Sequence, residues 1–204
     1  MKTGPKYKIC KRLGSSVFEK CQTQKFLLAE ERRGRVRGRS RPRALSDYGK
    51  QLIEKQKVRF TYGLAEKQLA RYVKESMSQK ILGPDQVLIK KLESRLDNTI
   101  YRAGLASTRS LARQIASHGH ITVNGKKVTI PSYSLVEGDI ISVREGSRSK
   151  KLFENLSEKL KEHQSPTWIS FDPKKMEGLI TETPADDMTQ LPFNLSTVLE
   201  YYSR

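Results

Sequence analysis

The sequence predicts an α+β protein, in which a mainly helical first domain is followed by a small module of two helices and a small antiparallel sheet. Apolar residues recur at helical spacing through residues 46–92, which is typical of amphipathic helices. Two further helical segments precede the dipeptide Asn124-Gly125, which stands between alternating apolar residues and is the strongest short-range signal of a β-hairpin. These two patterns together indicate the fold class.

The composition favours a polyanionic partner. The 204 residues include 39 Lys and Arg against 22 Asp and Glu, which gives a formal net charge of +17 and a pI near 9.9. So large an excess of positive charge favours a nucleic acid as partner over the reading of a merely soluble basic protein. No apolar run approaches the roughly 20 residues that span a bilayer, so we expect a soluble, cytoplasmic protein with no membrane contact.

The first segment, residues 1–45, is interpreted as a basic N-terminal arm. It carries 14 basic and 3 acidic side chains, a net charge of +11, and seven arginines stand between Arg32 and Arg43. We find no sustained periodicity here and expect the arginine-rich part to order only on a partner, with phosphate contact favoured over a solvated linker. Cys10 and Cys21 do not form a Cys-x-x-Cys pair, which favours free thiols over a metal site.

Residues 46–92 form the expected helical domain. Ser46 is suited to cap the first helix, and Gly63 separates it from the second. We expect the two helices to pack antiparallel through two apolar stripes, which are Leu52, Ile53, Gln56 and Phe60 on the first helix and Leu64, Leu69, Tyr72, Val73 and Met77 on the second. The distant segment 165–204 contains too many aromatic residues for a disordered tail, so we expect it to be ordered.

Residues 93–164 form the expected module. Apolar residues at helical spacing end at Gly104, and Thr108 is suited to cap a second helix, on which Arg109 and Arg113 share one face. The hairpin and one further strand then supply a small antiparallel sheet. An amphipathic pattern in residues 150–163 predicts a helix that returns toward the rest of the protein.

Several stretches resemble one protein family from end to end. They are "GPKYKICKRLG", "LSDYGKQLIEKQKVRFTYGLAEKQ", "SRLDNTIYRAGLASTRSLARQIASHGHITVNGKKVTIPSY", "PTWISFDPKKMEG" and "VLEYYSR". In this order they resemble the bacterial small-subunit ribosomal protein uS4 family, and residues 93 to about 146 resemble its small RNA-binding module. The resemblance implies that residues 46–92 pack with the C-terminal segment 165–204, with the module as an insertion between them. Many relatives carry four N-terminal cysteines that bind zinc, and this chain has only two, so a four-cysteine site is excluded.

The resemblance also implies a function. It predicts a structural ribosomal protein that binds 16S ribosomal RNA at a multi-helix junction of the 5′ domain and nucleates assembly of the body of the small subunit. The expected partners are 16S rRNA, ribosomal protein uS5, other small-subunit proteins and mRNA near its entry channel, with an influence on decoding accuracy. Some relatives repress translation of their own message, so autorepression is a further hypothesis. No cofactor, small-molecule substrate or metal is expected.

Double-stranded RNA hides its base edges in a deep groove, so the candidate residues are those that can grip phosphates and 2′-hydroxyls. The predicted RNA-binding residues are Arg41, Arg43, Tyr48, Gln56, Lys57, Arg95, Arg102, Arg109, Arg113, His118, Asn124, Lys126 and Lys127. Three alternatives stay open at this point. Arg95 and Arg102 could instead pair with Glu93 or Asp97, His118 could only close a helix, and Tyr48 could be mainly a packing residue.

The Arg-Leu-Asp triplet that ends at Asp97 raises the alternative of an enzyme. Pseudouridine synthases resemble this stretch, because some carry the same module and their active site has an Arg-Leu-Asp triplet with a catalytic Asp. Here the triplet lies inside the module, and the rest of the chain is short and basic. We therefore expect Asp97 to orient a neighbouring arginine toward phosphate, and we expect no enzymatic activity.

Overall fold

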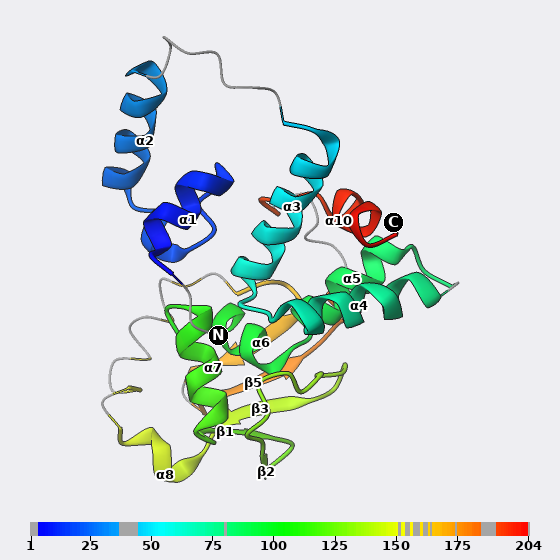
Figure 1. Ribbon diagram of the computed structural model, residues 1–204. Helices are drawn as coiled ribbons and strands as arrows, with labels where there is room; N and C mark the ends of the chain where they lie inside the picture. Colours follow the sequence, from blue (N-terminus) through cyan, green and yellow to red (C-terminus); the bar gives the residue numbers. More distant parts are fainter. Residues whose placement is uncertain are drawn as a thin grey trace. The chain divides into compact units, whose positions relative to one another are not determined.

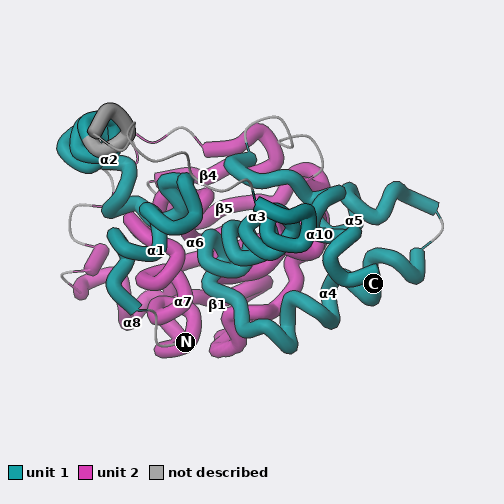
Figure 2. Tube along the Cα trace, turned by 45° about the horizontal axis from the view of Figure 1, so that its top comes forward, with its two compact units in different colours: residues 1–88, 189–204 teal, residues 89–188 magenta. Residues whose placement is uncertain are grey.

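The computed structural model describes residues 4–36, 45–79, 81–150, 152–153, 156, 160, 163, 165–173, 175–184 and 191–203, except for the side chains of 33–36. Figure 1 shows its helices and strands, and Figure 2 shows its division into two compact units. Unit 1 is Met1–Leu88 with Thr189–Arg204, and unit 2 is Ile89–Met188. Arg41, Arg43 and most of the predicted return helix lie outside the described residues.

Unit 1 is helical in its described part. Its elements are α1 (Lys6–Leu13), η1 (Glu19–Cys21), α2 (Gln24–Val36), α3 (Asp47–Thr61), α4 (Glu66–Ser78), α5 (Pro84–Glu93), which runs into unit 2, and α10 (Leu195–Tyr202). The expectation of no regular structure in the first segment was wrong as far as Val36, because α1 and α2 form there. A small apolar cluster supports them, with Cys10, Leu13, Val17, Phe18 and Cys21 buried at its centre.

Helix α3 begins where the sequence predicts. The Ser46 hydroxyl accepts a hydrogen bond from the Gly49 amide at 3.2 Å, which satisfies one of the free donors at the start of the helix. The apolar stripe was only partly correct, because the residues that α3 buries are Gln51, Lys55 and Val58. Ile53 and Phe60 pack against the apolar cluster of the first segment, whereas Gln51 and Lys55 contact α10.

The C-terminal helix α10 contacts both α3 and α4, whereas contact between α3 and α4 themselves is slight. The expected antiparallel pair is therefore wrong. A polar network explains the docking of α10: the buried Lys55 ammonium donates to Glu66 at 2.8 Å and lies 4.4 Å from the centroid of the Tyr201 ring. The Tyr202 hydroxyl donates to the same Glu66 oxygen at 2.7 Å. Burial opposes ionisation of Glu66, but the hydrogen bonds from Lys55 and Tyr202 outweigh it and lower the pKa of this carboxyl.

Unit 2 combines helices with one antiparallel sheet. Its helices, besides the end of α5, are α6 (Leu96–Arg102), α7 (Arg109–Ser117) and α8 (Glu145–Arg148). The sheet has the strand order β2-β1-β3-β5-β4, from β1 (Ile121–Val123), β2 (Lys126–Lys127), β3 (Ile140–Val143), β4 (Ile169–Asp172) and β5 (Glu177–Ile180). The hairpin prediction is confirmed, since Asn124 and Gly125 turn β1 into β2 with φ angles of 50° and 76°.

Residues 94–95, between α5 and α6, are not helical, although apolar residues recur at helical spacing on both sides of them. Apolar residues keep helical spacing from Leu92 to Leu96, but Arg95 is in extended backbone conformation and forms a bridge with Ser134. The Leu96 amide donates to the Tyr133 carbonyl at 2.8 Å. Contacts with the loop at residues 133–134 thus interrupt the helix. The spacing of apolar residues within one segment cannot predict a contact with such a distant loop.

Strands β4 and β5 come from the C-terminal segment. The aromatic residues of this segment predicted order, but its sequence did not indicate strands. Strand β5 pairs with β3, with Ile140 opposite Leu179 and Ile141 opposite Gly178. Trp168, Ile169 and Ile180 are buried in one apolar core together with residues of α6, α7, β1 and β3. In the structure, residues 169–180 thus complete the sheet of unit 2.

We expect Trp168→Ala to lower the free energy of unfolding by about 3 kcal/mol, because the indole is 6% exposed and its loss leaves a cavity beside the sheet. Urea unfolding followed by circular dichroism measures the change. Leu179→Ala is the control, since Leu179 is 42% exposed on β5 and should cost less than about 1 kcal/mol. Equal effects of the two variants would contradict the packing of β4 and β5 on the core.

Candidate nucleic-acid interface

The link from α5 into α6 buries an unusual number of polar side chains. Glu93 and Asp97 are each 3% exposed, and Asn98 is 1% exposed. Buried carboxylates are costly unless hydrogen bonds and opposite charges compensate for the loss of water. The partners of these three side chains therefore determine what the segment does.

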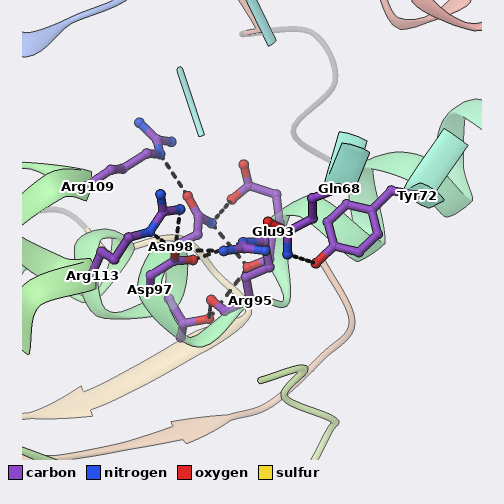
Figure 3. A network of polar contacts seen from close by, with 9 residues as sticks. Gln68, Tyr72, Glu93, Arg95, Asp97, Asn98, Arg109 and Arg113 are labelled. Carbon is purple, nitrogen blue, oxygen red and sulfur yellow. Dashed lines mark hydrogen bonds and ion pairs between the residues drawn. The ribbon is translucent and has the colours of Figure 1, made fainter. Parts of the chain in front are cut away.

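Asp97 is the acceptor for two arginines at once (Figure 3). Arg95 donates from Nε to Oδ1 at 3.0 Å and from Nη2 to Oδ2 at 2.8 Å, in a paired geometry. Arg113 donates from Nε and Nη2 to Oδ2, at 2.9 and 2.6 Å. Arg95 lies in the interior beside Asp97, whereas the Arg113 side chain is 32% exposed.

Glu93 and Asn98 hold the other two arginines. Arg102 donates to both carboxylate oxygens of Glu93, at 2.9 and 3.1 Å. Asn98 donates its side-chain amide to Glu93 at 2.7 Å and accepts from Arg109 Nε at 2.9 Å. The Arg109 guanidinium also lies over the Tyr101 ring, 4.3 Å from its centroid.

Local structure explains why these side chains meet. Thr108 caps α7 by accepting from the Leu111 amide at 3.1 Å, as predicted, so Arg109 and Arg113 stand one turn apart on the same face. Asp97 and Asn98 lie in the first turn of α6, and α6 packs against α7. We call Arg95, Arg102, Arg109 and Arg113 the arginine cluster. With two carboxylates among four guanidinium groups, the cluster keeps an excess of two positive charges, and its donors are held in place before any ligand arrives.

The hairpin residues have different surroundings. Lys126 and Lys127 form β2 and are exposed. Asn124 is occupied by the turn itself, since its amide donates to Asp139 at 2.8 Å and its carbonyl oxygen accepts from the Ile140 amide at 2.9 Å. His118 is the exposed C-cap residue of α7.

The remaining candidates belong to unit 1. Tyr48 is 51% exposed on α3, and its hydroxyl lies 3.5 Å from that of Tyr201. Lys57 pairs with Glu54 at 2.6 Å, and Gln56 accepts from Arg59 at 3.3 Å. The structure thus brings together the four arginines of unit 2, while it places the α3 candidates on a separate unit.

Sequence reasoning missed Asn98, which links Glu93 to Arg109. The available signal was the run "ESRLDN", in which acidic and basic residues alternate at the start of a helix. The sequence left open that Arg95 and Arg102 pair with Glu93 or Asp97, and both pairs are present, Arg95 with Asp97 and Arg102 with Glu93.

The two cysteines lie in the apolar cluster of the first segment. Both are free and buried, and burial, followed by a hydrogen bond with Cys10, raises the pKa of the Cys21 thiol to about 12. Over the described residues, no group of three or more His, Cys, Asp or Glu side chains is arranged to hold a metal ion. Within the same residues, none of the helices has the length and apolar character to cross a membrane.

Comparison with known proteins divides the chain at nearly the same place as the compact units. Residues 1–93 match the model of the ribosomal protein S4/S9 N-terminal domain, and residues 94–141 match that of the S4 domain. Among curated relatives, the small ribosomal subunit protein uS4 of Borrelia turicatae is 43% identical over 200 residues, which cover 98% of this chain and 96% of the relative. The protein of the same name from Thermotoga maritima is 42% identical over 208 residues, 99% and 98% of the two chains.

We expect Asp97→Asn to lower the free energy of unfolding by about 3 kcal/mol, because it removes the buried negative charge that pairs with both Arg95 and Arg113. Chemical unfolding measures the loss. Glu137→Gln removes an exposed carboxylate and should change stability by less than about 0.5 kcal/mol. An Asp97→Asn protein as stable as wild type would mean that this carboxylate does not organise the cluster.

Proposed function

Because the chain belongs to the uS4 family of small-subunit ribosomal proteins, we propose that it binds 16S ribosomal RNA and acts as a structural part of the small ribosomal subunit. The observation that carries this proposal is the arginine cluster. Its guanidinium groups are fixed on buried acidic and amide side chains, and they keep an excess of positive charge. Planar groups held in this way suit the phosphates of folded RNA.

The members of the predicted site take different roles in this proposal. Arg102, Arg109 and Arg113 contact RNA phosphates or 2′-hydroxyls, and His118, Lys126 and Lys127 make further contacts with the RNA. Arg95 supports Arg113 through their shared partner Asp97 and does not itself reach the RNA, since it is 2% exposed. Asn124 keeps the hairpin in shape and presents Lys126 and Lys127.

A second part of the RNA contact is assigned to the first unit. Tyr48, Gln56 and Lys57 on α3, with Arg41 and Arg43 before it, are proposed to bind a neighbouring RNA helix. The strongly basic sequence of residues 1–45 supports this assignment. Two separate surfaces on one chain suit an RNA junction, where helices leave in different directions.

The RNA target, the role in assembly and the protein partners are proposed from membership of the uS4 family. We propose that the RNA target is a multi-helix junction in the 5′ domain of 16S rRNA, that binding nucleates assembly of the subunit body, and that the protein works in the cytoplasm. Contacts with uS5, with other small-subunit proteins and with mRNA near its entry channel belong to the same proposal, as do an influence on decoding accuracy and repression of the protein's own message. The domain division expected with it is the arm 1–45, the helical domain 46–92 with 165–204, and the module 93–164. In the structure α10 belongs to unit 1 as this division expects, whereas β4 and β5 complete the sheet of unit 2.

The position of Asp97 supports a structural role over an enzymatic one. A catalytic carboxylate of a pseudouridine synthase must reach a base, whereas Asp97 is 3% exposed and both of its oxygens accept from arginine. The triplet in this chain therefore serves to position Arg95 and Arg113. We propose that the protein has no enzymatic activity.

The test is binding to the 5′ domain of 16S rRNA across a salt series. We expect the double variant Arg109→Ala, Arg113→Ala to bind more weakly, with a log-log slope that is flatter by roughly 0.7 to 0.9 for each phosphate that the variant no longer neutralises. Lys67→Ala, Lys74→Ala is the matched control, since it removes two positive charges from exposed positions on α4. Unrelated RNA serves as competitor, and a wild-type protein that shows no preference for the 5′ domain would contradict the proposal.

A further inference from the structure

A second group of basic side chains lies at the opposite end of α7. His118 and Gly119 close that helix, and β1 then pairs with β3, which brings Arg144 next to His120: the Arg144 amide donates to the His120 carbonyl at 2.9 Å. The rings of His118 and His120 are 6.1 Å apart. The Lys127 side chain passes so close to Gly119 that any larger side chain there would meet it.

We call His118, His120, Lys127, Arg144 and Lys150 the His120 cluster. His120 is at its centre and is half-buried, with Nδ1 2.9 Å from the Ser147 hydroxyl and its ring edge-on to Phe153 at 6.2 Å. The other four side chains are exposed. Short α8 adds Glu145 and Arg148 nearby, and Arg148 Nε donates to the Val143 carbonyl at 3.2 Å.

The two basic groups differ in how their charge is compensated. Arg102 and Arg113 each pair with a buried carboxylate. Within the described part of the chain, Lys127, Arg144 and Lys150 form no ion pair with an acidic side chain. Among the residues that the structure describes, the charge of these three side chains is therefore not compensated by an ion pair.

The backbone places these side chains around His120: Arg144 donates its amide to the His120 carbonyl, Lys127 passes Gly119, and Lys150 donates its amide at 3.1 Å to the carbonyl of Ser147, whose hydroxyl contacts the His120 ring. Burial lowers the pKa of the imidazole, and the positive charges of Lys150, His118, Arg144 and Lys127 lower it further. A cluster of this kind concentrates a positive potential that a phosphate can neutralise.

We propose that His118, Lys127, Arg144 and Lys150 form a second phosphate-binding site for RNA, separate from the arginine cluster. The inference rests on the proposed RNA-binding function and extends it. Arg144 and Lys150 lie beyond residue 141, where the match to the S4 domain ends, so the site adds to the part of the chain that the domain model covers.

A pH dependence follows from the position of His120. A bound phosphate brings negative charge to the cluster, which favours the protonated imidazole and raises the pKa of His120 in the complex above its value in the free protein. Binding then takes up a proton. Affinity for RNA should therefore rise as the pH falls through the pKa of His120 in the complex, and the rise should be smaller in His120→Asn.

The first experiment is the salt series with the double variant Arg144→Ala, Lys150→Ala. Removal of two phosphate-binding charges should flatten the log-log slope by roughly 1.4 to 1.8 and weaken binding to the 5′ domain of 16S rRNA. Lys67→Ala, Lys74→Ala again removes two exposed charges and should leave the slope unchanged. Circular dichroism and thermal melting show whether each variant is folded.

The second experiment compares wild type, His120→Asn and His118→Asn between pH 5.5 and 7.5 at constant salt, a range that brackets the ordinary pKa of histidine near 6.5. A smaller rise in affinity for His120→Asn than for wild type supports coupling at the half-buried ring, and His118→Asn measures the part that the exposed ring contributes. A rise for His120→Asn equal to that of wild type would contradict the coupling.

The outcomes separate the two proposals. If wild type prefers the 5′ domain but Arg144→Ala, Lys150→Ala keeps the wild-type slope, the second phosphate site is wrong and the proposed function stands. If wild type shows no preference for this RNA, the proposed function itself fails. A flatter slope for Arg144→Ala, Lys150→Ala, with an unchanged slope for the α4 control, supports the second site.

Discussion

The buried carboxylates of Glu93 and Asp97 are the constraint on which unit 2 depends. Each is 3% exposed, so each requires positive partners, and the partners come from three places in the chain: Arg95 beside them, Arg102 at the end of α6, and Arg113 on α7. The Glu93–Arg102 pair joins the end of α5 to the end of α6, and the Asp97–Arg113 pair joins α6 to α7. Apolar packing alone tolerates small sliding movements, whereas paired guanidinium geometry does not.

The same constraint links stability to recognition. Arginines on a solvated helix sample many rotamers, and ordering them on a ligand costs up to about 2 kcal/mol each. Here Arg102, Arg109 and Arg113 are ordered by the fold itself, because each donates to a buried side chain. Their immobilisation is thus completed during folding, and less entropy is left to lose when a polyanion binds.

Signals that act within a few residues predicted much of this structure. Contacts between residues far apart in sequence were not predicted. Ser46, Thr108 and the Asn124-Gly125 turn act within a few residues, and all three do in the structure what the sequence indicated. Strand β5 was missed because its pairing with β3 joins residues far apart in sequence, and β4, which pairs with β5, was missed with it. The break between α5 and α6 was missed for the same reason, since the loop that replaces the helical turn includes Tyr133. For the site, spacing placed Arg109 and Arg113 on one face, but only the folded chain shows that Asn98 and Asp97 hold them.

The late position of β4 and β5 in the chain has a consequence for synthesis. Strand β3 is made well before residues 169–180, so for part of translation its outer edge has no partner, although the rest of the S4 domain is already present. Open strand edges invite pairing with other chains. On β3 the exposed Ile140 makes this edge apolar. Until β5 is made, the module therefore presents an open strand edge of the kind that can pair with another chain, and residues 169–180 then cover this edge.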